Sequence, residues 1–428
     1  MYIFNHIFKI MTMALAMLVA LPSMAQVPAP PQVGPVALTG GTVVTVSGET
    51  IEQGTVVFDQ GKIVAVGRNV TIPEGAEVID VSGQYVYPAM IHARSTLGLT
   101  EVGRVSETVD LNEFGDINPN VRIQVAYHAG SEHISLVRTH GIAVTVATPS
   151  GGLISGLSAA MLTDGWTWED MTLQAPVAMI VNWPNMQNAR QREEGLKQLQ
   201  EAFDSARRYY QAKKAAGQRG IPHHNTDVRW EAMIPVLEGQ VPVHIFANEI
   251  TQIQAAINWA ERENLEMVLV GARDAHYVLP QLKAKDIPVI ITPVIGSPSR
   301  QWEAYDLSYR LPALLHEAGI RFCIAGEASA ANVIRLPNHA ASAVAFGLPQ
   351  DEALKSLTLY PAQILGLGYR MGSIEAGKDA SLVVADGNLL ELSTQVLQVF
   401  IQGRTVHMMD KHRRLYELYD QKYRQLGE

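Results

Sequence analysis

Short apolar runs recur through the middle of the chain, and stretches with helical spacing of apolar residues separate them. The strand-like runs occupy residues 141–148, 176–183, 241–248, 267–271, 287–294 and 320–326. The helical stretches occupy residues 190–216, 228–238, 249–263, 274–284, 308–318, 338–346 and 350–357. Near-continuous apolar strands separated by amphipathic helices are typical of a parallel sheet that is buried on both faces. The pattern predicts an α/β fold for the central part of the chain.

Both ends of the chain have a different pattern, in which β-branched runs alternate with glycine, aspartate and proline. Residues 54–67 (GTVVFDQGKIVAVG) predict a hairpin with a tight turn near Asp59. Residues 371–388 and 396–406 form a matching β-rich piece near the other end. Because the edges of short sheets need partners, we expect the two ends to build one small β-sandwich.

The chain therefore divides into a central block and flanking pieces. The expected composite β-sandwich comprises residues 36–87 and 366–407, and the central block comprises residues 88–365. Residues 408–428 predict a polar terminal helix, with Leu415, Leu418 and Tyr419 as a narrow docking stripe. The Pro-rich residues 26–35 predict an extended linker that does not pack.

The first twenty-five residues have the pattern of a cleavable signal peptide. Lys9 precedes an apolar run over residues 10–21, and Ser23-Met24-Ala25 is a small-x-small cleavage site. The run is shorter than the roughly 20 apolar residues of a membrane span. We expect a signal peptide over residues 1–25 and a periplasmic or secreted protein. The single cysteine, Cys323, allows no intrachain disulfide.

The charge balance restricts the partners. The formal charge is −9, and loss of the signal peptide with Lys9 would make it −10. This argues against a nucleic-acid partner and, after processing, against a membrane partner. The nucleophile elbow G-x-S-x-G of serine hydrolases is absent from the sequence.

The segment from Gly83 to Gly103, GQYVYPAMIHARSTLGLTEVG, predicts a buried strand from Val86 to Leu99 that ends in a loop. It resembles the entry strand of the amidohydrolase superfamily, of form P-G-x-I-D-x-H-x-H-x-G. The positions that match are Pro88, Ile91, Ala93 and Gly98. Residues 372–384, GSIEAGKDASLVV, resemble a second segment of that family, with Ser381 where aspartate is usual. The chain is most similar to the secreted, imidazolonepropionase-like branch.

This resemblance implies a TIM-like (β/α)₈ barrel over residues 88–365, beside the composite β-sandwich. It also implies a hydrolase of non-peptide C–N (amide) bonds that uses a divalent metal such as zinc. In the family, the metal ligands lie at the carboxyl ends of the barrel strands. The bound ion lowers the pKa of a water molecule to about 7 and polarises the scissile carbonyl.

Several ligand positions of the family hold other residues here. Arg94 and Thr96 replace the two histidines of H-x-H, while Phe246 and Val270 replace histidines of two later strands. A guanidinium keeps its protons and cannot ligate a metal. His92 stands where the family has aspartate, as a surviving ligand or a hydrogen-bonded core histidine. The sequence therefore assigns no metal ligands and does not support the zinc cofactor.

The catalytic candidates are Glu327, at the position of the family's last aspartate, and His244, two residues before Phe246. Each has a purely structural alternative, an ion pair for Glu327 and a buried, satisfied ring for His244. Arg94, Thr96, His92 and Phe246 are expected at the site mouth. We consider an ion pair between Arg94 and Glu327, which would replace the metal's charge.

Three functions agree with these residues. The chain is a metal-assisted amide hydrolase with altered chemistry, a catalytically silent protein that binds a small molecule, or a non-catalytic subunit of an intact amidohydrolase paralogue. The partner is then a small-molecule substrate or ligand, another copy of the chain, or that paralogue. The sequence does not identify the substrate, the metal, the oligomeric state or whether the chain is an enzyme.

Overall fold

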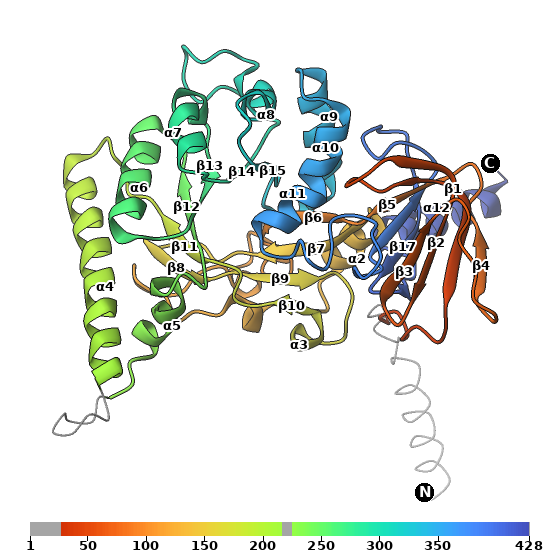
Figure 1. The fold of residues 1–428 in the computed structure, drawn as a ribbon, viewed down its shortest axis with the longest axis horizontal. Helices are drawn as coiled ribbons and strands as arrows, with labels where there is room; N and C mark the ends of the chain where they lie inside the picture. Colours follow the sequence, from red (N-terminus) through yellow and green to blue (C-terminus); the bar gives the residue numbers. More distant parts are fainter. Residues whose placement is uncertain (1–26, 216–224, 428) are drawn as a thin grey trace, which may run out of the picture.

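A computed structural model describes residues 27–215 and 225–427, and it has a mixed α/β fold (Figure 1). The strands of the chain ends are β1 (Val36–Val44), β2 (Thr50–Asp59), β3 (Lys62–Gly67), β4 (Glu77–Asp80), β5 (Tyr85–Pro88), β16 (Leu382–Ala385), β17 (Val396–Ile401) and β18 (Arg404–Thr405). The central strands are β6 (Met90–Ser95), β7 (Ile142–Ala147), β8 (Ile154–Leu157), β9 (Ala159–Leu162), β10 (Thr172–Gln174), β11 (Met179–Asn182), β12 (Val243–Ala247), β13 (Met267–Gly271), β14 (Val289–Ile291) and β15 (Phe322–Ile324).

Helices separate most of the central strands. The α-helices are α2 (Glu132–Thr139), α3 (Trp168–Met171), α4 (Ala189–Ala215), α5 (Val228–Leu237), α6 (Ile250–Glu263), α7 (Leu279–Ala284), α8 (Leu307–Glu317), α9 (Leu336–Ala345), α10 (Gln350–Leu357), α11 (Leu359–Ile364) and α12 (Lys411–Leu426). The 3₁₀ turns are η1 (Ser106–Thr108), η2 (Ile123–Ala126), η3 (Ala275–Tyr277) and η4 (Ala330–Arg335). Among the described residues, none of the helices combines the length and apolar character that a membrane crossing requires.

The two ends of the chain build one eight-stranded sheet, which lies at the right of Figure 1. Its order is β18-β17-β16-β5-β1-β2-β3, and β4 pairs with β1 beside this path. β5 from the first end pairs antiparallel with β16 from the second, with Val86 opposite Val384. Phe58 and Phe400 meet in its core, with ring centroids 5.2 Å apart. This strand pairing joins both ends as predicted, but it does not define two stacked sheets.

The central strands form two further sheets, of orders β15-β14-β13-β12-β11-β8 and β10-β9-β7-β6. The pairs from β11 to β15 are parallel, as is the pair β6–β7. The chain passes from one sheet to the other between Leu157 and Ala159, where β8 ends and β9 begins. The edge strands β6 and β15 belong to different sheets. Just after them, the Thr96 N–H donates to the carbonyl oxygen of Ala328 over 2.7 Å. The strand pairing by itself does not close the predicted barrel.

The central strands are apolar at nearly every position because side chains on both of their faces are buried. Ile91, Val270 and Ile290 belong to one hydrophobic core cluster. Ile245 and Leu269 belong to a second core, where they pack with residues of α6 and the other helices. Successive side chains of a strand point to opposite faces, so burial on both faces requires an apolar residue at nearly every position.

Most of the predicted elements are confirmed, and three predictions are wrong in detail. The predicted strand from Val86 to Leu99 is two strands, because the Ala89 N–H donates to the Ser381 carbonyl and β5 joins the end sheet. The predicted helix over residues 274–284 divides into η3 and α7. The expected signal peptide lies outside the described residues.

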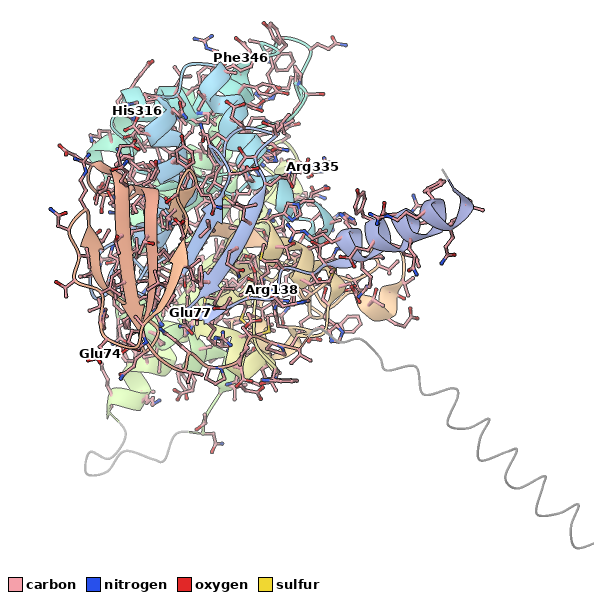
Figure 2. All side chains as sticks on the ribbon, turned by 90° about the vertical axis from the view of Figure 1, so that its right-hand side faces the viewer. Glu74, Glu77, Arg138, His316, Arg335 and Phe346 are labelled. Atoms are coloured by element: carbon pink, nitrogen blue, oxygen red, sulfur yellow. The ribbon has the colours of Figure 1, made fainter. Side chains whose placement is uncertain are left out.

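The third error concerns the Pro-rich residues 26–35, of which residues 27–35 are described. Pro28 and Ala29 are buried, and the Ala29 N–H donates to the buried carboxylate of Asp164 over 3.2 Å. The same carboxylate pairs with Arg138 of α2 at 2.5 Å and with Arg404 of β18 at 3.0 Å. Figure 2 labels Arg138 and shows α12 extending away from the strands. The segment is therefore held by a hydrogen bond that composition does not reveal.

Candidate functional site

A small cavity lies where the family places its chemistry, at the carboxyl ends of β6, β7, β11 and β12. Its lining comprises Ala93, Arg94, Thr148, Pro149, Ile180, Asn182, His244, Phe246, Val270 and Ile290. The lining brings together Arg94, Phe246 and Val270, three residues that replace histidines of the family pattern. The free volume is about 20 Å³, which is room for a single water molecule.

Arg94 and Phe246 stack at this point. The Arg94 Cζ lies 4.9 Å from the centroid of the Phe246 ring, a distance at which a cation is attracted to the face of an aromatic ring. Burial lowers the pKa of the Arg94 guanidinium from its usual value, but arginine remains charged at any pH that proteins tolerate. A cation and an aromatic ring therefore stand where metal ligands are expected.

His244 faces the same cavity from β12. Its side chain is almost fully buried, with 3% exposed, and its Nε2 has no hydrogen-bond partner among the described residues. Burial lowers the pKa of the ring to about 4. The imidazole is therefore neutral at pH 7. The structural alternative, a ring with all its hydrogen bonds satisfied, is not what the structure contains.

Glu327 follows β15 and is half-buried, but it does not line the cavity. Within the described residues, the ion pairs do not include one between Glu327 and Arg94. The interaction considered from the sequence is therefore not formed. The catalytic roles of Glu327 and His244 stay predictions, and the structure brings only His244 to the cavity.

Thr96 also lies away from the cavity and instead joins two loops. Its hydroxyl donates to the Ala328 carbonyl oxygen and accepts the Ala330 N–H, both over 3.2 Å. These bonds connect the end of β6 to the segment after β15, which carries Glu327. The Thr96 side chain is thus occupied by backbone groups.

His92 is fully buried outside the cavity lining, opposite Thr145 of β7. Strict alternation would place His92 and Arg94 on one face, so the difference follows from the register irregularity of β6 between His92 and Ser95. Neither ring nitrogen has a hydrogen-bond partner among the described residues. The pKa of His92 is lowered to about 3, mainly by burial and to a smaller extent by the nearby His339 of α9. His92 is therefore a neutral, buried residue that does not line this cavity, and its expected place at the site mouth stays a prediction.

The sequence reasoning missed an ionic cluster beyond the ends of β12 and β13. Asp274 is buried and accepts two hydrogen bonds from Arg300, at 3.2 and 2.7 Å. Its Oδ2 also accepts the N–H of Ile250 at the start of α6. The Glu303 Oε1 lies 3.4 Å from the Arg273 Nε. These contacts hold the loop before α8. The sequence feature that could have indicated this cluster is the charged pair Arg273-Asp274 directly after a strand.

The described residues do not offer a metal site. Within residues 27–215 and 225–427, no three His, Cys, Asp or Glu side chains are grouped so that they could hold a metal ion. The cavity itself contributes one such side chain, His244. The residues at these strand ends therefore do not fit the divalent metal that the family resemblance implies.

Comparisons with known proteins identify the relatives of this chain. A model of the amidohydrolase family matches residues 307–406. The amidohydrolase tasK of Hapsidospora irregularis is 23% identical over 394 residues, which are 82% of this chain. The match covers 39% of that relative, so this chain spans about two-fifths of its length.

Solved structures give a similar result. An amidohydrolase from Thermotoga maritima MSB8 is 25% identical, with a TM-score of 0.80 over 87% of this chain and 99% of that one. A molinate hydrolase is 16% identical, with a TM-score of 0.55 over 88% of this chain and 95% of that one, and shares the fold. With the two quoted segments, these matches show that the chain belongs to the amidohydrolase superfamily.

Proposed function

We propose that this protein is a non-catalytic amidohydrolase-fold subunit that works with a catalytically complete amidohydrolase paralogue. One observation carries the proposal. The cavity at the strand ends is lined by the stacked Arg94 and Phe246, and its volume of about 20 Å³ is too small for an amide substrate. Typical small-molecule sites are roughly 300–1,000 Å³.

The degenerate metal site supports the same proposal. A hydrolase of this superfamily needs ligands that hold the ion and its water, and the strand ends carry Arg94, Phe246 and Val270 at ligand positions. A chain that keeps the fold but lacks metal ligands at several strands can still act as a binding or structural subunit.

We propose that the counterpart of this chain is a paralogue with intact H-x-H histidines. The reaction of the assembly would be hydrolysis of a non-peptide C–N bond.

We further propose that the central sheets close into a TIM-like barrel and that the end sheet folds into the expected sandwich. The Thr96–Ala328 hydrogen bond and the direct passage from β8 to β9 support closure. The pattern of the first twenty-five residues supports export to the periplasm or beyond.

The test uses the full mature chain, expressed alone and together with the H-x-H paralogue of the same genome. Alone, we expect substoichiometric zinc by elemental analysis and no hydrolysis of an amide panel. With the paralogue, we expect a defined complex by light scattering and hydrolysis. Stoichiometric zinc with hydrolysis by the chain alone would overturn the proposal, as would failure of the two proteins to associate.

Matched variants locate the chemistry within the complex. Glu327→Gln in this chain should leave the rate of the complex unchanged, because the half-buried carboxylate is not at the cavity. Replacing the two H-x-H histidines of the paralogue by alanine should abolish the rate. If Glu327→Gln abolishes hydrolysis while the complex still forms, this chain contributes catalysis and the proposal is wrong.

A further inference from the structure

Arg94 places a positive charge at the strand ends without a protein counter-charge. No carboxylate lines its cavity, and none of the described carboxylates forms an ion pair with it. Within the described part of the chain, the guanidinium contacts the face of the Phe246 ring. A ring face attracts a cation but does not satisfy the five directional N–H donors of a guanidinium. The Arg94 side chain is half-buried, so its N–H donors remain available to a ligand in the cavity.

His244 supplies a second donor to the same space. Its ring lines the cavity, is 97% buried and carries an Nε2 without a hydrogen-bond partner among the described residues. A neutral imidazole holds one N–H and can donate it. The ring therefore adds a hydrogen-bond donor to the cavity without adding a second charge.

The other polar side chains of the lining are already engaged. The Asn182 amide nitrogen donates to the Gly152 carbonyl oxygen and to the Ser155 Oγ, both over 2.9 Å. The Thr148 hydroxyl donates to the Val146 carbonyl oxygen over 3.1 Å. The rest of the wall is apolar, namely Ala93, Pro149, Ile180, Phe246, Val270 and Ile290. The donors that remain for a ligand belong to Arg94 and His244.

We propose that this cavity is a binding site for a small monovalent anion of the size of chloride, held by the Arg94 guanidinium and the His244 N–H. The volume of about 20 Å³ matches one water-sized occupant. The position that holds a cation in metal-dependent relatives would hold an anion here. This site is independent of the subunit proposal, because it requires neither a partner nor a reaction.

The test measures thermal unfolding of the full mature chain in sodium chloride and in sodium gluconate at constant ionic strength. A ligand that binds the folded state raises the melting temperature with its concentration. We expect a rise of roughly 2 °C as chloride replaces gluconate at 100 mM, for binding in the millimolar range. Arg94→Met should abolish this rise, and His244→Leu should reduce it.

The matched control is Arg321→Met, since Arg321 is an exposed arginine paired with Asp286 away from the cavity. This variant should keep the full dependence on chloride. If Arg94→Met does not fold, bromide-soaked crystals of the unmodified protein provide the second measurement, with an anomalous peak expected beside Arg94 and His244. An equal chloride effect in Arg94→Met, or bromide peaks elsewhere and none in the cavity, would overturn the proposal.

Discussion

The guanidinium of Arg94 lies against the face of the Phe246 ring, with 4.9 Å between Cζ and the ring centroid. The two residues come from β6 and from β12, more than 150 positions apart in the sequence. Both residues line the cavity, which has a volume of about 20 Å³.

Phe246→Ala should enlarge the cavity and expose the half-buried Arg94 further to water. Loss of a largely buried aromatic side chain costs about 3 kcal/mol of unfolding free energy, partly offset here because the ring is not fully buried. Urea unfolding measures the loss, and a crystal structure measures the cavity. Phe246→Leu is the control and should lose less. Equal stability of the alanine variant and the unmodified protein would show that the ring does not pack against Arg94.

Thr96→Val should loosen the segment after β15. The isosteric valine removes the hydroxyl that accepts the Ala330 N–H and donates to Ala328, and an unsatisfied donor costs about 1–3 kcal/mol. Amide hydrogen exchange at Ala330 should become faster. Thr96→Ser keeps the hydroxyl and should preserve the protection of that amide, whereas identical exchange in all three proteins would contradict the assignment.

Asp164→Asn should destabilise the protein strongly. The carboxylate is buried and pairs with Arg138 at 2.5 Å and Arg404 at 3.0 Å. Removing one partner of a buried ion pair costs about 3–5 kcal/mol, because the remaining charges lose their compensation. Urea unfolding measures the cost. Asp286→Asn is the control, since Asp286 and Arg321 form an exposed pair and should contribute less than about 1 kcal/mol.

The buried histidines should make the fold sensitive to acid. Burial holds the pKa of His92 at about 3 and those of His244 and His339 at about 4, below the value of about 6.5 in an unfolded chain. The unfolded state therefore binds more protons between these values, so stability falls as the pH falls from about 6.5 toward 4. Below the folded pKa values, the loss from these groups is complete.

His92→Leu tests this assignment. It removes a fully buried ring whose nitrogens have no partner among the described residues, so stability at pH 7 should change little. Between pH 4 and 6, the slope of the unfolding free energy should decrease by about 1.4 kcal/mol per pH unit, which corresponds to one proton. An unchanged slope would mean that His92 titrates normally in the folded protein.

Particular elements show how far sequence reasoning extends. Residues 267–271 were predicted as a strand and form β13, because five apolar residues in a row suit burial on both faces. The strand from Val86 to Leu99 was predicted as one unit and is divided at Ala89. That division depends on Ser381, whose carbonyl accepts the Ala89 N–H from almost three hundred positions away.

For the candidate site, too, the sequence predicted some positions correctly and others not. The family pattern located Arg94, Phe246 and His244 on strands whose carboxyl ends meet, and the three residues do line one cavity. It also suggested a pair between Arg94 and Glu327, which is not formed among the described residues, and a place for His92 at the mouth, whereas His92 does not line this cavity. Spacing along a strand does not account for the register irregularity between His92 and Ser95.

The sequence alone determined the alternation of strands and helices and the superfamily, since these depend on residue type and local spacing. The tertiary structure alone decided that Arg94 stacks on Phe246, that Thr96 bonds to the backbone of the segment after β15, and that Ala29 is held by Asp164. Each of these contacts joins residues far apart in the chain. Their geometry follows from strand register and packing, which local sequence does not encode.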